Sequence, residues 1–185
     1  MGTGTSLPGF TPINASTEAP LEMLAACHGR VQRQCETLQR LLPHVAQYGA
    51  DDAARQAATA VMRYFDTAAV DHHADEERDL FPALREAVAG SDAVCVVDLI
   101  ESLRADHRQL ESLWRALRVS LAALAGGDAS AMQAGTVTRF IEAYQRHIVH
   151  EDTELLPMAA RLLDDAALQT VGAAMRERRG IAPVR

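Results

Sequence analysis

The chain has 185 residues, of which 48% are apolar but only 4% are aromatic, and its formal net charge is −7 at pH 7. This length and composition suit a single domain with a core of alanine, leucine and valine, and they favour helices over strands. The negative charge argues against a nucleic-acid partner or an anionic membrane surface, because phosphates would be repelled.

The first helix is preceded by an irregular lead-in. Prolines, threonines and other turn-forming residues are frequent in residues 1–20 and disfavour a helix there. From Leu21, apolar residues keep a helical period as far as Pro43, and Gly49 provides a stop signal. We therefore expect the domain to begin with a long helix after about 20 residues.

A second helix is predicted to follow directly. Asp51 and Asp52 are candidate caps at its start. We expect it to run to about Leu80, to restart after Pro82 and to end before Gly90.

The third and fourth helices have similar signals. Ser91 and Asp92 are candidate caps of the third, which we expect to end at the glycine pair 126–127. Asp128 or Ser130 is expected to start the fourth helix.

These elements predict an all-α fold, an up-down four-helix bundle. The bundle would span residues 21–164 and consist of two helical hairpins, 21–89 and 92–162. A short C-terminal helix is expected at about 165–178, within a tail that extends to residue 185.

The pattern His-x-x-x-Glu recurs along the predicted helices, at His72/Glu76, His107/Glu111 and His147/Glu151. An α-helix advances about 100° per residue, so a spacing of four places both side chains on one face, one turn apart. A fourth histidine, His28, lies on the remaining long helix. Together these seven side chains predict a metal site inside the bundle.

The surroundings of these residues repeat as well. The segment HHADEERDLFP (72–82) aligns with HIVHEDTELLP (147–157), so that His, Glu, a second acidic residue and Pro fall in register. The helices of His28 and His107 also match in their apolar positions. The repeating unit is therefore a helical hairpin, and two hairpins would bring four histidines to one midplane.

A lone histidine on a helix is more often exposed, or hydrogen-bonded in the core, than a metal ligand, and we interpret His44 and His150 in that way. Four histidines at equivalent points of apolar helices are different, because burying them without a partner for their lone pairs would be costly. The pair His73/Glu77 is an alternative to the pair one residue earlier. It ranks second because position 73 aligns with the apolar Ile148, which suggests a place beside the site.

The number and type of ligands indicate the metal. Seven ligands exceed what one tetrahedral zinc ion uses, and the three cysteines have no metal-binding spacing. Imidazoles with carboxylates suit iron or manganese, and carboxylates can bridge two ions about 3.5 to 4 Å apart. We therefore predict two iron ions. Ferritin-like bundles differ, since they carry Glu-x-x-His with the carboxylate first.

From His28 to Pro157 the chain resembles the hemerythrin-like family, the bacterial HHE cation-binding domains, and the likeness is carried by His28, His107 and the two aligned segments. The resemblance implies a non-haem di-iron centre with an oxo or hydroxo bridge. It also implies that Glu76 and one carboxylate of the fourth helix bridge the ions. The terminal ligands would be the four histidines His28, His72, His107 and His147.

Two features depart from the oxygen-carrying hemerythrins that the family includes. Those proteins have His-x-x-x-His on the third helix, where this chain has His107/Glu111. Their last carboxylate follows its histidine by five residues, the position of Asp152, whereas Glu151 follows by four, so either residue could bridge. A carboxylate in place of an imidazole stabilises ferric iron, which disfavours reversible oxygen carriage.

Three functions remain open: a di-iron protein that senses or buffers oxygen, nitric oxide or iron; a di-iron oxidoreductase that reduces peroxide or oxidises ferrous iron; and a structural bundle with adventitious metal. The expected partner is a small diatomic molecule or peroxide, and a homodimer is a possible assembly. No apolar run approaches about 18 residues and no export signal is evident, so we expect a soluble cytoplasmic protein without a membrane partner.

Overall fold

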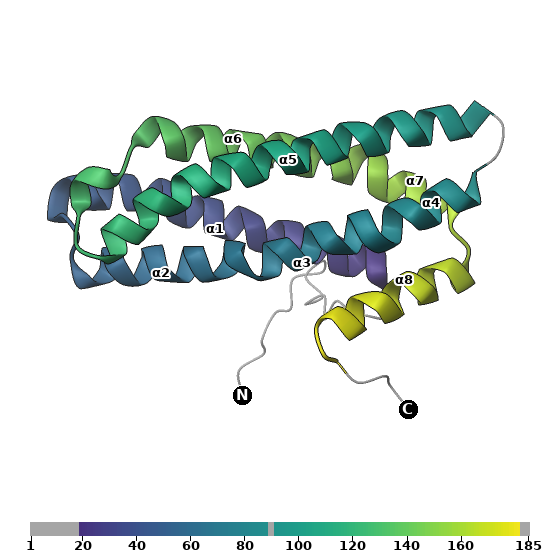
Figure 1. Ribbon diagram of the computed structural model, residues 1–185, viewed down its shortest axis with the longest axis horizontal. Helices are drawn as coiled ribbons and strands as arrows, with labels where there is room; N and C mark the ends of the chain where they lie inside the picture. Colours follow the sequence, from purple (N-terminus) through teal and green to yellow (C-terminus); the bar gives the residue numbers. More distant parts are fainter. Residues whose placement is uncertain (1–18, 89–90, 182–185) are drawn as a thin grey trace, which may run out of the picture.

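The computed structural model describes residues 19–88 and 91–181, and this part of the chain consists of helices joined by short turns, without a strand. The prediction of an all-α bundle is thereby confirmed. The long helical segments lie side by side, and the C-terminal helix packs across them near one end (Figure 1). In chain order the α-helices are α1 (Pro20–Tyr48), α2 (Asp52–Asp66), α3 (Ala68–Asp75), α4 (Phe81–Ala87), α5 (Ser91–Ala125), α6 (Ala134–His150), α7 (Leu156–Leu162) and α8 (Asp165–Arg178).

The first helix begins and ends largely as its sequence predicts, whereas the second, expected to run to about Leu80, is interrupted at Thr67, between the end of α2 at Asp66 and the start of α3 at Ala68. The expected irregular lead-in lies mostly outside the described residues, which begin at residue 19. Helix α1 continues past Pro43, and Gly49, with a φ of 70°, ends it. The Asp51 carboxylate then caps α2 by accepting a hydrogen bond of 2.8 Å from the backbone N–H of Ala54.

The predicted break before Pro82 is wrong, because the helix continues through a wide π-turn, η1 (Glu76–Leu80). In this turn the N–H of Phe81 donates to the carbonyl of residue 76, five positions earlier. A second π-turn, η3 (Glu151–Leu155), joins α6 to α7 and precedes Pro157 in the same way. Proline has no N–H to continue the α-helical ladder, and the wide turn absorbs this loss without ending the helix.

The start of the fourth helix also differs from expectation. Asp128 caps only a short 3₁₀ turn, η2 (Ala129–Ala131), where its carboxylate accepts from the backbone N–H and the hydroxyl of Ser130. Helix α6 begins after this turn, so neither Asp128 nor Ser130 starts it. Helix α5 does begin at Ser91, but the predicted caps, the side chains of Ser91 and Asp92, lie outside what the structure describes.

Helix α8 has the bounds that the sequence predicts. The Asp164 carboxylate caps it by accepting from the N–H of Ala167 at 2.8 Å. The helix contacts α1, α3 and η1, and it buries Val171 and Met175 against them. The C-terminal helix is therefore part of the packed body of the protein. Within the described residues, no helix has the length and apolar character that crossing a membrane requires.

The core consists of two apolar clusters. The first includes Leu38, Phe65, Leu117 and Phe140, and the second includes Leu24, Phe81, Leu103 and Leu155. Each long helical segment contributes to both clusters, and along each of them histidine or glutamate lies at the junction between the two. The fold thus places a polar layer between two apolar clusters, and this layer is the candidate site.

Candidate metal centre

The polar layer is built from six side chains that are at most 4% exposed. They come from different elements, so the packing of the helices, and not one local motif, assembles the layer. Its members are His28 from α1, His72 from α3, Glu76 from η1, His107 from α5, His147 from α6 and Glu151 from η3. All six are among the seven ligands that the sequence predicts.

These six residues form two groups with converging ligand atoms. His28 and His72 form one group with the two glutamates, and His107 and His147 form the other with the same glutamates. Within each group the ligand atoms lie within 4.8 Å of one another. Both carboxylates therefore belong to both groups.

Each carboxylate directs one oxygen to each side. In Glu76, Oε1 lies 3.4 Å from Nε2 of His72, and Oε2 lies 3.3 Å from Nε2 of His107. In Glu151, Oε2 lies 3.0 Å from Nε2 of His28, and Oε1 lies 3.2 Å from Nε2 of His147. The two carboxylates therefore connect two pairs of imidazoles.

The ligand atoms themselves show that a cation fits here. Nε2 of His28, His107 and His147 and all four oxygens of Glu76 and Glu151 are buried, and none has a hydrogen-bond partner within the described part of the chain. Unpartnered buried polar atoms are costly and rare. Two ligand atoms that bind one ion about 2.1 Å away, at right angles, lie about 3.0 Å apart, close to the shorter distances seen here. A metal ion in each group, sharing the two carboxylates, would satisfy these atoms.

The pKa values fit a positive charge between the carboxylates. Burial, with the neighbouring charge of Glu151, raises the pKa of Glu76 to about 8. Burial also opposes the charge on Glu151, but contacts with the imidazoles of His107 and His28 outweigh it and hold the pKa of Glu151 well below its ordinary value. Burial disfavours a charged His28, yet its carboxylate neighbours raise its pKa to about 9. In His72, burial prevails and lowers the pKa to about 3.

Two further carboxylates orient the imidazoles from outside. Nδ1 of His107 donates to Oε1 of Glu77 at 2.7 Å, and Nδ1 of His28 donates to Oδ1 of Asp152 at 2.7 Å. A proton on Nδ1 leaves the Nε2 lone pair free toward the centre, the arrangement that metal-binding histidines use. This geometry distinguishes Glu151 from Asp152 as the bridging carboxylate of the fourth helix. Glu151 faces the ligand groups, whereas Asp152 is 45% exposed and lies outside them.

The outer role of Glu77 and Asp152 was not predicted, although the repeat contains its signal. Each follows an inward-facing glutamate by one residue, and the aligned segments place an acidic residue at both points. Each contacts the histidine that belongs to the other hairpin: Glu77 contacts His107, and Asp152 contacts His28. These contacts between the two hairpins depend on how the hairpins pack, so the sequence alone does not show them.

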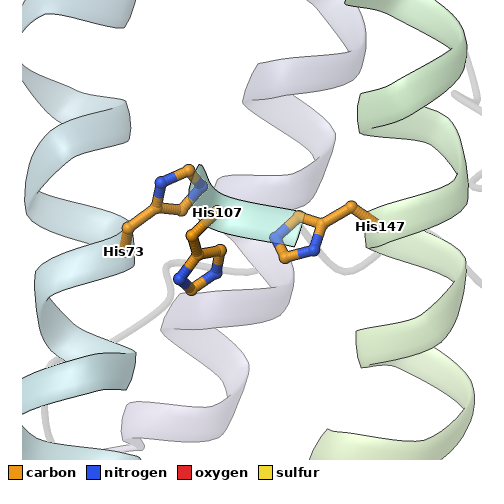
Figure 2. Close-up of side chains that lie close together, drawn as sticks. All are labelled: His73, His107 and His147. Carbon is orange, nitrogen blue, oxygen red and sulfur yellow. The ribbon is translucent and has the colours of Figure 1, made fainter. Parts of the chain in front are cut away.

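His73 also faces the interior, although Glu77, its partner in the alternative pair, lies outside the groups of converging ligand atoms. One nitrogen of His73 lies within 4.8 Å of ligand nitrogens of His107 and His147, and Figure 2 shows the three side chains close together. The ring of His73 stacks on that of His107, with centroids 4.1 Å apart and planes 13° apart. The alignment of His73 with Ile148, which is itself buried, is therefore consistent with an inward-facing position.

The seventh predicted ligand is corrected by the structure. The Glu111 side chain is 69% exposed and lies 4.0 Å from the Arg115 guanidinium, outside both groups. The π-turns begin at Glu76 and Glu151, whereas α5 is a regular helix at this point and buries Leu110 instead. The carboxylate four residues after the histidine therefore faces inward at Glu76 and Glu151 but faces solvent at Glu111.

The other histidines lie toward the surface, as predicted. His44 contacts Asp51 at 2.9 Å, and its side chain is about one third exposed. His150 lies 3.7 Å from Glu154 and 3.8 Å from Asp106. Neither belongs to a group of converging ligand atoms among the described residues.

Comparison with known proteins supports this picture. A family model described as the hemerythrin HHE cation-binding domain matches residues 19–159. An uncharacterized protein of Haemophilus influenzae is 32% identical over 167 residues, which cover 90% of this chain and 94% of that protein. The range matched by the family model contains all six residues of the polar layer and ends before α8.

Proposed function

The chain belongs to the family of hemerythrin HHE cation-binding domains, and on that premise we propose that it holds a non-haem di-iron centre. The shared carboxylates carry this proposal. Because Glu76 and Glu151 each direct one oxygen to either pair of imidazoles, both can bridge two ions. One ion would then be bound by His28 and His72, and the other by His107 and His147. The long helices would form the up-down four-helix bundle typical of the family.

Iron suits the donor set better than zinc. Each ion would receive two imidazoles and two carboxylate oxygens, and no cysteine belongs to either group. Such a centre, when filled, supplies redox chemistry and open positions for small molecules. Glu77 and Asp152 would hold the imidazoles of His107 and His28 in the tautomer that binds metal through Nε2, and the burial of the six side chains would exclude bulk water.

We propose that the centre senses or buffers oxygen, nitric oxide or iron. The burial of the ligand set supports this function, because six side chains that are at most 4% exposed restrict access to the ligand atoms. The carboxylate-rich set favours a second candidate, a di-iron oxidoreductase that reduces peroxide or oxidises ferrous iron. A purely structural bundle fits less well, since it would leave the inward oxygens of Glu76 and Glu151 without partners.

Metal analysis tests the proposal. We expect about two irons per chain in protein purified without chelator, with a charge-transfer band in the near-ultraviolet and visible spectrum that dithionite bleaches. His72→Ala and His147→Ala should lose most of the iron, while the surface variant His44→Ala should retain it. Zinc, no metal, or equal retention in all three variants would refute the di-iron assignment.

The same preparation separates the two functional candidates. Rapid consumption of peroxide or oxygen in the presence of a reductant would favour the oxidoreductase. Stoichiometric spectral changes without turnover would favour the sensor or buffer.

A further inference from the structure

A pocket of about 440 Å³ opens on the surface between α3 and α5. Its lining includes Val70 and Ala74 of α3 and two exposed arginines, Arg78 of η1 and Arg108 of α5. His73 and His107 also line it, although both rings reach the buried polar layer. The pocket therefore leads from solvent to the edge of the metal centre, on the side of the group that contains His107 and His147.

His73 stands between this pocket and the centre. It lines the pocket, and one of its nitrogens lies within 4.8 Å of ligand nitrogens of His107 and His147. Its Nε2 is buried and has no hydrogen-bond partner in residues 19–88 and 91–181. A buried imidazole nitrogen without a partner is costly, and an incoming ligand could satisfy it.

The stacked geometry argues against His73 as a ligand of the same ion as His107. An imidazole lone pair lies in the plane of its ring, so a bound metal lies close to that plane. The two rings are nearly parallel and stacked, at 13° and 4.1 Å between centroids. One ion cannot lie near both planes, so His107, whose Nε2 faces the carboxylates, is the ligand and His73 covers it.

We propose that this pocket admits a small anion to the centre and that His73 donates a hydrogen bond to that anion from Nε2. The inference rests on the proposed function, since it assigns an entrance and a donor to the same centre. The anion would lie beside the His107/His147 pair, where His73 reaches the ligand nitrogens.

The charges around the pocket favour an anion. Arg78 and Arg108 flank the opening, and the ions of the proposed centre add positive charge at its inner end. Two carboxylates also line the pocket, but each contacts a cationic or hydrogen-donating group. Glu77 accepts from His107, and Glu111 lies 4.0 Å from Arg115. The two residues that line the pocket and reach the ligand groups, His73 and His107, offer nitrogen atoms.

Azide is a suitable probe, because it is small, anionic and changes the absorption of ferric centres. The experiment uses the iron-loaded full chain in three forms: wild type, His73→Gln and His73→Phe. Glutamine keeps a donor, whereas phenylalanine keeps an aromatic ring without one. Iron content is measured first, and then the dissociation constant and association rate of azide. His44→Phe serves as the matched control, because His44 contacts Asp51 and lies outside this pocket.

All variants should retain the iron of the wild type. His73→Phe should raise the azide dissociation constant at least about tenfold, the loss expected for a hydrogen bond to a charged acceptor. His73→Gln should stay within about threefold of wild type, and His44→Phe should not differ from it. Arg108→Ser should slow azide association and weaken its dependence on salt, because a rim charge acts mainly on the association rate.

Two results would overturn the inference while leaving the di-iron centre intact. One is an unchanged azide dissociation constant in iron-loaded His73→Phe. The other is the loss of one iron in both His73 variants, which would make His73 a ligand. A wild-type chain that binds no iron would refute the proposed function itself, and this inference with it.

Discussion

Replacing Asp75 with alanine should destabilise the chain strongly, because its fully buried carboxylate joins the C-terminal helix to the metal-binding helices. Asp75 accepts hydrogen bonds from Arg178 and from Arg179, the latter at 2.6 Å. Arg178 also donates to Asp79 at 2.7 Å, and Arg179 donates to the carbonyl of Met175 at 2.9 Å. Without the Asp75 carboxylate, both guanidinium groups would lose their shared partner.

The size of the effect follows from burial. Removing one partner of a buried ion pair costs about 3 to 5 kcal/mol, since the other charge is left uncompensated. The Arg178 and Arg179 side chains are 16% and 20% exposed, and each keeps one other bond, which places the expected loss near the lower end, at about 3 kcal/mol. In a chain of this length, such a loss corresponds to a fall in Tm of about 6 to 12 °C.

Urea unfolding of the metal-free chain, followed by circular dichroism, measures this loss. Glu101→Ala is the matched control, because Glu101 also contacts two arginines, Arg85 at 3.2 Å and Arg104 at 3.3 Å, but is 52% exposed. The control should lose less than about 1 kcal/mol. Adding Arg179→Ala to Asp75→Ala should recover part of the loss. An Asp75→Ala variant no less stable than Glu101→Ala would refute the reasoning.

Three further outcomes are expected. Glu111→Ala should retain the full iron content by metal analysis, because this side chain is exposed and outside the centre; loss of iron would restore Glu111 to the ligand set. Asp152→Asn should weaken metal affinity about 10- to 100-fold in chelator competition, since it orients His28 from outside; unchanged affinity would contradict that role. In the metal-free chain, the pKa of His28 is raised from 6.5 to about 9 and that of Glu76 from 4.5 to about 8. Both groups therefore contribute stability at low pH that is lost as the pH rises, between about 4.5 and 8 for Glu76 and between about 6.5 and 9 for His28. The urea concentration at the unfolding midpoint should therefore decrease as the pH rises from about 6.5 to about 9, and an increase would contradict the assignment.

The helices were largely predictable because their signals are local. Apolar periodicity and the Asp51 cap depend on residues that are neighbours along the chain, and the structure agrees with both. The break expected at Pro82 failed because a proline signals only the loss of its own N–H, whereas packing on both sides keeps the helix in line through a π-turn. The same limit applies to Asp128, whose capping signal is real but belongs to a short 3₁₀ turn.

The ligand set shows where sequence reasoning ends. A spacing of four determines which side chains share a helix face, but not how far that face is turned toward the centre. The pattern therefore included Glu111, which α5 directs to solvent, on the same grounds as Glu76, which η1 directs inward. It also left Glu151 and Asp152 as alternatives, although they have different places in the structure.

The sequence by itself determined the helical fold, the family and the types of side chain at the site, because helical periodicity and each His-x-x-x-Glu motif involve residues that are close together along the chain. Only the tertiary structure decided the role of each group. Glu76 and Glu151 are shared between two imidazole pairs, while Glu77 and Asp152 orient imidazoles of the opposite hairpin. His73 lies between the pocket and the centre. The contact of Asp75 with Arg179, 104 residues away along the chain, is also decided only by the tertiary structure. Such relations depend on distances between helices, which packing sets and helical periodicity does not contain.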